Sequence, residues 1–175
     1  MVPTQNSRNE SSTEGTKMKQ KTDRGFSLIE LLIVVAIIGI IAAIAIPNLL
    51  ASRRAANEGS AQSSLRTIST CEAAYLHTYG SGTYADLATL GSKVMTDSVL
   101  SAGSKSGYDF AVNPVAGPPA QFWAYGYPIT TSGLGQTGTR RFGLTEDGVL
   151  RGDLNLAAGA PTDYATVLAL PPLGN

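Results

Sequence analysis

Residues 25–47 read GFSLIELLIVVAIIGIIAAIAIP, an apolar run with a single charged side chain, Glu30. The part from Phe26 to Ile46 has 21 residues. As an α-helix this length covers about 30 Å, the thickness of a bilayer core. The chain therefore has a segment able to span a membrane. An ionised side chain inside hydrocarbon costs about 2.5 kcal/mol or more, so Glu30 marks a functional position that needs a partner.

The basic residues near this run are distributed unevenly. Four of them precede it, Lys17, Lys19, Lys21 and Arg24, and two follow it closely, Arg53 and Arg54. Cytoplasmic flanks of membrane spans are enriched in Lys and Arg. We therefore expect the N-terminus to lie in the cytoplasm and the bulk of the chain to lie on the other side of the membrane.

The composition limits what the rest of the chain can be. The 175 residues include 13 basic and 13 acidic ones, which allows one modest domain outside the membrane and gives no electrostatic reason to expect nucleic-acid binding. A single cysteine, Cys71, excludes a disulfide framework within the chain, and we interpret it as a small apolar helix residue.

The first residues have a different character from the apolar run. Residues 1–16 are rich in Ser, Thr, Asn and Glu and lack an apolar period, which is typical of a segment that need not fold. Met18 then opens a basic octapeptide. It is a second candidate start, and the sequence leaves open whether translation begins at Met1 or Met18.

The helix is expected to continue beyond the apolar run. Pro47 weakens it by removing a backbone donor, yet helix-forming residues resume at once. Further on, apolar residues recur every three or four positions and form one stripe, which is followed by Gly80 and Gly82 as a stop. The stripe consists of Ala61, Leu65, Ile68, Cys71, Tyr75 and Tyr79. We therefore predict one long helix with a weak point at Pro47.

The C-terminal half is expected to form a small sheet. Residues 83–91 predict a short helix capped by Thr83 or Asp86, and four short runs predict strands at 108–113, 121–127, 140–145 and 148–151, the last two joined by the turn 146–148. Residues 164–170 predict a final edge strand or a docking tail. The expected fold class is α+β, with the long helix packed on an antiparallel meander of about four strands.

The apolar run allows three interpretations. An ordinary signal peptide would use Ala43-Ile44-Ala45 as a cleavage site, but the run is too long and continues past Pro47. A plain anchor leaves Glu30 unexplained. Cleavage between Gly25 and Phe26 would instead free an amine that stays largely protonated near neutral pH. When many such helices pack together, the amine of one copy can pair with Glu30 of the next and set the register.

These residues resemble a known family. Arg24-Gly25, then Phe26-Ser-Leu-Ile-Glu30, then the aliphatic run to Pro47, resembles the class III signal of type IV prepilins and of the related pseudopilins of type II secretion. The match extends from Lys17 to about Ala56. The resemblance implies cleavage by prepilin peptidase after Gly25, methylation of the Phe26 amine, and guidance of assembly by Glu30.

The same resemblance implies an organisation and a setting. It divides the chain into a leader at 1–25, an assembly half of the helix at 26–46, an amphipathic half at 47–80 and a head at 81–175. It places Gly39 and Pro47 where the helix of this family bends or loosens on assembly. A precursor in the bacterial inner membrane, with its head in the periplasm, would enter a fibre at the cell surface or in the periplasm.

The expected function is that of a structural subunit, not an enzyme, that forms a homopolymeric fibre for adhesion, motility or surface contact. Its expected partners are other copies of itself, the peptidase, an assembly platform with its ATPase, and the bilayer before assembly. A type II secretion pseudopilin is the alternative. A secreted enzyme or binding protein, with a mature start near Ile46, is a remote one.

Other candidate residues have plainer explanations. Four oxygen donors lie near the C-terminal loops but match no calcium loop, so no metal or cofactor is assigned: Asp147, Asp153, Asn155 and Asp163. Trp123, Tyr125 and Tyr127 share one face of a strand, as a core stripe or as a contact surface. His77, the loop Gly133–Gly135 and the pair Arg140-Arg141 suggest no catalytic, phosphate or DNA site.

Overall fold

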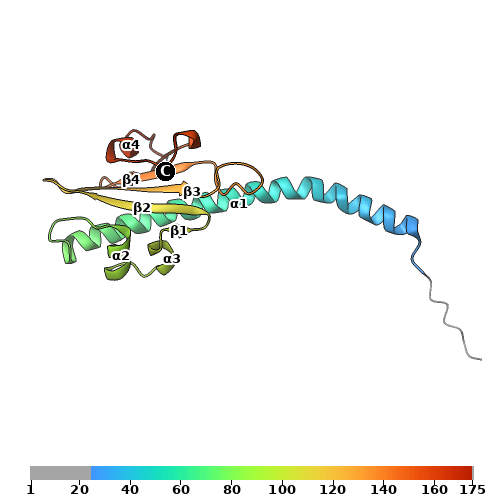
Figure 1. The fold of residues 1–175 in the computed structure, drawn as a ribbon, viewed down its shortest axis with the longest axis horizontal. Coiled ribbons are helices and arrows are strands. Elements are labelled where there is room, and N and C mark those ends of the chain that lie inside the picture. The colour runs from blue at the N-terminus through green and yellow to red at the C-terminus, as the bar shows by residue number, and fades with distance from the viewer. Residues whose placement is uncertain (1–24, 175) are drawn as a thin grey trace, which may run out of the picture. The chain divides into compact units, whose positions relative to one another are not determined.

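The computed structural model describes residues 25–174, and Figure 1 traces their elements. The chain divides into two compact units, Met1–Ile40 and Ile41–Asn175. One helix, α1 (Leu28–Thr78), passes from the first unit into the second. Most of the expected leader, including Met18 and the basic residues up to Arg24, lies outside the described residues.

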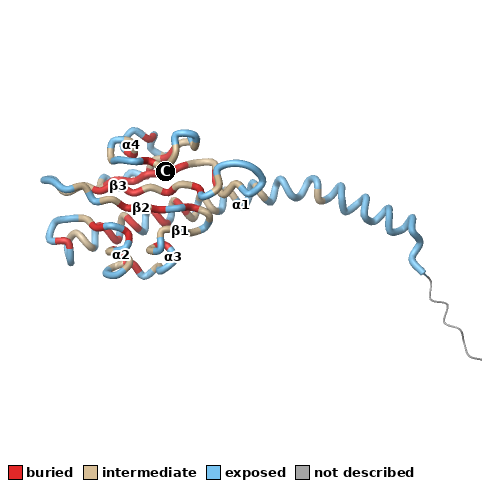
Figure 2. Tube along the Cα trace, viewed as in Figure 1, coloured by how far each residue is buried: buried red, intermediate tan, exposed pale blue. Residues whose placement is uncertain are grey.

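The described part of the first unit is an exposed helix. Large apolar side chains are open along it, including Leu28 at 80% exposure and Ile40 at 64%. Figure 2 shows the same exposure along this part of α1. Within residues 25–174, α1 is the one helix long and apolar enough to cross a membrane. The predicted single long helix is confirmed, because α1 continues through Gly39 and Pro47.

The second unit is built on a five-stranded antiparallel meander. Its strands are β1 (Ser104–Lys105), β2 (Tyr108–Val115), β3 (Gln121–Pro128), β4 (Arg141–Thr145) and β5 (Arg151–Asp153), and they lie in the order of the sequence. The remaining elements are α2 (Leu87–Lys93), α3 (Ser98–Ser101), the 3-10 helix η1 (Leu156–Ala158) and α4 (Tyr164–Leu168). The α+β fold class is thereby confirmed.

The hydrophobic core lies between α1 and one face of the sheet. On α1, Ala61, Leu65 and Ile68 are fully buried, and Cys71 is 9% exposed. The facing side chains of the strands are Phe110, Val112, Phe122, Ala124, Phe142 and Leu144. Tyr75 packs against this core. Tyr79 was predicted to join the stripe but lies one residue beyond the end of α1 at Thr78 and is 55% exposed.

The strand predictions differ from the structure at both edges of the sheet. β1 lies in a stretch expected to be a link, where two residues pair with the start of β2. The fourth predicted strand, 148–151, is displaced to Arg151–Asp153. Here Asp147 accepts from the N–H of Val149 at 2.9 Å, which stabilises a turn where the strand was expected.

Of the two alternatives predicted for residues 164–170, an edge strand or a docking tail, the edge strand is wrong. Residues Tyr164–Leu168 form α4, whose N-cap Asp163 accepts from the N–H of Thr166 at 2.7 Å. Val167 of α4 packs over Gly143 of β4, where an added Cβ would lie 2.7 Å from the valine side chain. After α4 the chain returns to the edge of the sheet. There Pro172 forms an isolated antiparallel β-bridge with Arg151, and the N–H of Leu173 donates to the carbonyl of Leu150 at 2.9 Å.

The connection from α1 to the sheet contains two short capped helices. Asp86 caps α2 by accepting from the N–H of Thr89 at 2.8 Å, so this one of the two predicted caps is confirmed. Thr83 instead donates to the carbonyl of Gly80. Helix α3 was not predicted; Asp97 caps it by accepting from the N–H of Leu100 at 3.0 Å. Leu90 and Leu100 from these helices complete the core.

The packing of α1 on the sheet generates a stability prediction. Leu65→Ala removes a fully buried side chain that faces Gly126 and Phe110, and is expected to lower the free energy of unfolding by about 2–5 kcal/mol. Chemical unfolding of the full chain in detergent micelles measures it. Leu154→Ala is the matched control, since Leu154 is 63% exposed and its change should have little effect. Equal effects of the two substitutions would contradict this core.

Candidate functional site

The start of α1 gives Glu30 a partner inside its own chain. The backbone N–H of Ser27 donates to the Glu30 carboxylate at 2.9 Å, and the N–H of Leu31 donates to the carbonyl of Ser27 at 3.2 Å. This spacing, Ser-x-x-Glu at a helix start, is that of a capping box. Ser27 was not predicted as the partner of Glu30, although the Ser-x-x-Glu spacing that indicates it is present in the sequence.

The cap leaves the carboxylate able to bind a cation. A carboxylate has two oxygens with about four acceptor positions, and the Ser27 N–H occupies one of them. Glu30 itself is exposed. The hydrogen bond therefore holds the charged group at the end of α1 while capacity remains for a second partner.

The predicted cleavage site is open. Gly25 and Phe26 precede the first helical residue and are both exposed, and Phe26 is 76% exposed. An added Cβ at Gly25 would meet no atom within 4 Å. The peptide bond between these residues is thus accessible to a partner. Cleavage, methylation and the assembly role of Glu30 stay predictions.

The first part of α1 presents two different faces. At 3.6 residues per turn, two seams fall on nearly opposite sides of the helix, each repeating at spacings of three and four. The bulky seam consists of Glu30, Val34, Ile37, Ile41 and Ile44. The small seam consists of Leu32, Ala36, Gly39, Ala43 and Ile46. One side is therefore ridged with β-branched side chains, and the other has small residues at its middle.

The predicted loosening points remain helical in this structure. Pro47 lies inside α1, and no atom lies within 4 Å of a Cβ built on Gly39. Loosening of the helix at these two residues on assembly stays a prediction.

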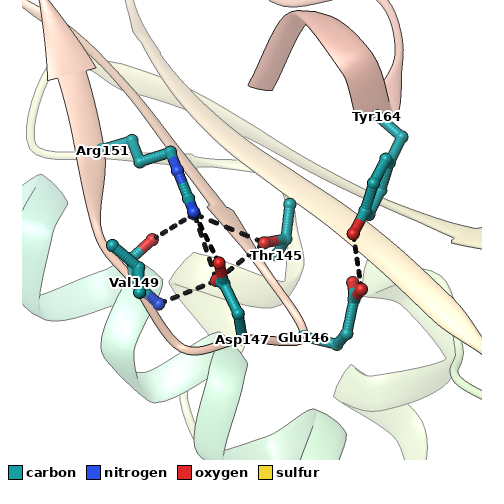
Figure 3. A network of polar contacts seen from close by, with 6 residues as sticks. All are labelled: Thr145, Glu146, Asp147, Val149, Arg151 and Tyr164. Atoms are coloured by element: carbon teal, nitrogen blue, oxygen red, sulfur yellow. Dashed lines mark hydrogen bonds and ion pairs between the residues drawn. The ribbon is translucent and has the colours of Figure 1, made fainter. Parts of the chain in front are cut away.

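A polar network fastens the turn between β4 and β5 (Figure 3). Asp147 accepts from the Arg151 guanidinium at 2.5 Å and from the hydroxyl of buried Thr145 at 2.7 Å. Hydrogen bonding to Arg151 lowers the pKa of Asp147 to about 2. The Tyr164 hydroxyl donates to Glu146 at 2.5 Å, which ties α4 to the same turn. The network therefore stabilises the turn between β4 and β5 and its contact with α4.

Three of the four oxygen donors considered for calcium, Asp147, Asp153 and Asp163, have protein partners. Asp153 binds Arg141 through two hydrogen bonds, 2.7 Å from Nε and 2.9 Å from Nη2. Asp147 binds Arg151, and Asp163 caps α4. Residues 25–174 contain no group of three or more His, Cys, Asp and Glu side chains arranged to hold a metal ion. Arg141, from the predicted basic pair, is buried by this contact.

The aromatic residues of β3 face away from the core. Phe122 and Ala124 point toward α1, so Trp123, Tyr125 and Tyr127 lie half-buried on the other face. The interpretation of these three residues as a core stripe is wrong, because the alternation of β3 is offset by one residue from that expectation. The rings of Trp123 and Tyr125 stack with centroids 6.0 Å apart, and Tyr127 donates to the carbonyl of Leu156.

A family model and two known proteins resemble parts of this chain. A family model described as the prokaryotic N-terminal methylation motif matches residues 20–46. The type IV major pilin protein PilA of Myxococcus xanthus is 47% identical over 53 residues, which are 30% of this chain and 24% of that protein. The type IV wide pilus major component PilA4 of Thermus thermophilus is 69% identical over 35 residues, 20% of this chain and 27% of that protein.

These matches concern a limited part of each protein. The chain spans about a quarter of the length of the curated relatives it matches, 24% and 27%. No solved structure matches the chain. The motif and both relatives nevertheless agree with the resemblance that Gly25, Phe26 and Glu30 suggested. Residues 20–46 therefore match the prokaryotic N-terminal methylation motif, and parts of the chain are similar to two type IV pilus components.

Proposed function

We propose that this chain is the structural subunit of a type IV pilus-like fibre that polymerises through α1. The observation that carries this proposal is an apolar half-helix that is exposed along its length and lies in an N-terminal methylation motif. Monomeric soluble proteins rarely expose contiguous apolar patches larger than a few hundred Å². Lipid covers this surface before assembly, and other copies of the chain cover it afterwards.

Processing supplies the second partner of Glu30. In this proposal prepilin peptidase cuts after Gly25 and methylates the new amine of Phe26, which keeps its positive charge. The carboxylate capped by Ser27 then pairs with the amine of a neighbouring subunit. Residues 1–25 act as the leader, 26–46 as the assembly half of α1, 47–80 as its amphipathic half and 81–175 as the head.

The two seams of α1 support a fibre over a closed dimer. The ridged bulky seam of one copy can pack against the small seam of another, because small residues allow helices to approach closely. Such a contact joins two different faces, so it is heterologous. Heterologous contacts that do not close into a ring generate open helical filaments.

The proposed location of the precursor rests on the apolar assembly half of α1, residues 26–46. The precursor resides in the bacterial inner membrane with a cytoplasmic N-terminus, and an assembly platform with its ATPase extracts it into the fibre. Both named relatives are pilus components, which supports a pilus used for adhesion, motility or surface contact. Their names give no support to an enzymatic role.

Processing predicts a defined mature N-terminus. Mass spectrometry of the mature protein should find Phe26 as the first residue, with one methyl group on its amine. A mature start near Ile46 would indicate ordinary signal peptidase and overturn the proposal. Gly25→Leu should leave the precursor uncut, because a large side chain obstructs the peptidase at a position that is open in this structure.

Charge pairing predicts different effects of two Glu30 variants. Glu30→Gln keeps an oxygen that can accept from Ser27 N–H but loses the charge, whereas Glu30→Ala loses both. Both variants should insert in the membrane and fail to form fibres in electron micrographs. The Ser27 amide should stay protected from hydrogen exchange in the Gln variant and lose protection in the Ala variant. Normal fibres from Glu30→Gln would exclude the charge pairing.

The small seam predicts a size limit at Gly39. Gly39→Leu should leave the isolated chain folded, since no atom lies within 4 Å of the added Cβ, but should abolish fibres by separating the helices. Gly39→Ala is the matched control, because it removes the same backbone freedom while staying small, and it should keep fibres. If both variants lost fibres, backbone loosening rather than seam packing would explain the need for Gly39.

A further inference from the structure

Glu72 is a fully buried carboxyl group on the inner face of α1. Its exposed fraction is 0%, and it lies one turn beyond Ile68 on the side that packs against the sheet. One oxygen accepts from the backbone N–H of Ala85 at 3.1 Å. Within residues 25–174 the other oxygen, Oε1, has no hydrogen-bond partner. A buried polar atom without a partner is rare enough to require a physical explanation.

The groups around Glu72 do not compensate a negative charge. On its own helix the adjacent titratable group is the Cys71 thiol, and the segment that packs over it contributes Tyr84 and Asp86. From the turn after β4, Glu146 acts on the same tyrosine. All of these groups are neutral or acidic. Burial is the main cause that raises the pKa of Glu72 to about 7, Asp86 adds to it, and the Ala85 N–H opposes it.

The hydrogen bond of Glu72 fastens one particular segment. Residues 80–86 connect α1 to α2 and fold back over the end of α1, where Ala85 is 5% exposed. The ring of Tyr84 packs against Phe122 of β3 with centroids 4.7 Å apart. An open cleft beside this segment is lined by Leu76, His77, Ser81, Gly82, Tyr84 and Ala120. The segment that covers Glu72 therefore has one side open to solvent.

We propose that Glu72 is a pH-sensitive latch: its neutral carboxyl group holds residues 80–86 closed over α1, and loss of its proton releases them. The ionised form needs donors for both oxygens, and the described part of the protein provides one, the Ala85 N–H. Water can supply the rest after the segment has moved. The fold would thereby change locally at the end of α1 while the sheet stays intact.

The direction of the pH effect follows from the raised pKa. An unfolded glutamate has a pKa of about 4.3, so the neutral form favours the closed segment fully below that pH. This contribution is lost as the pH rises through about 7. Between these limits the opening equilibrium should increase by about tenfold per pH unit, provided that opening exposes Glu72 fully.

Hydrogen exchange of the full chain in detergent micelles tests the latch. After correction for intrinsic exchange, the Ala85 amide of the wild type should open about tenfold more for each unit between about pH 5 and 7. Glu72→Gln, which keeps the shape and an acceptor oxygen, should remain closed with no such slope. Glu58→Gln makes the same change elsewhere on α1, where Glu58 accepts from Thr139 at 2.7 Å, and should keep the wild-type slope.

Two results would overturn the latch. One is a wild-type Ala85 amide whose opening does not depend on pH, and the other is the same slope in Glu72→Gln. If Glu72→Gln fails to fold, the side-chain carboxyl carbon of Glu72 can be titrated by NMR in the wild type. A midpoint near the ordinary value for glutamate would then contradict the proposal, and one near 7 would support it.

Discussion

Helix α1 carries more apolar surface than the described residues 25–174 cover. The sheet buries one face of its second half, through Ala61, Leu65 and Ile68. Along the first half, large apolar side chains stay exposed from Phe26 to Ile46. Because burial contributes about 25 cal/mol per Å² of apolar surface, this half must find another covering medium. Of the remaining helices and strands of the described residues, α2, α3, β2, β3 and β4 complete the core around the second half.

The two halves of α1 differ in the pattern of their apolar residues. The second half has one apolar stripe, because the sheet approaches it from one side. The first half has apolar side chains around the helix, with Ala36, Gly39 and Ala43 at the middle of one seam and β-branched residues along the opposite seam. The capping bond between Ser27 and Glu30 gives the charged group a partner at the helix end, where backbone N–H groups lack one. A continuous helix can therefore serve two environments without a change of fold.

Much of this arrangement was predictable from the sequence. The length of the apolar run predicted the first half of α1. In the second half, the spacing of apolar residues by three and four positions predicted the face that buries Leu65 and Ile68. Short runs of strand-forming residues predicted β2, β3 and β4, and an aspartate before a helical pattern predicted the Asp86 cap of α2. The errors occurred where tertiary contacts overrode local preference. Tyr164–Leu168 resembles a strand by composition, but Asp163 caps it and Val167 packs as a helix residue over Gly143. The burial of Glu72 was not predictable, since it depends on a segment 13 residues further along the chain.

The return of the C-terminal segment to β5 has a consequence for association between chains. Through the bridge of Pro172 to Arg151 and the bond from Leu173 to Leu150, this segment occupies backbone groups at the last strand of the sheet. Unpaired strand edges are templates for uncontrolled pairing between molecules. A protein that is concentrated in an ordered array brings such edges near one another. By closing this edge with its own tail, the chain makes sheet-to-sheet pairing a weaker competitor of the contacts proposed for α1.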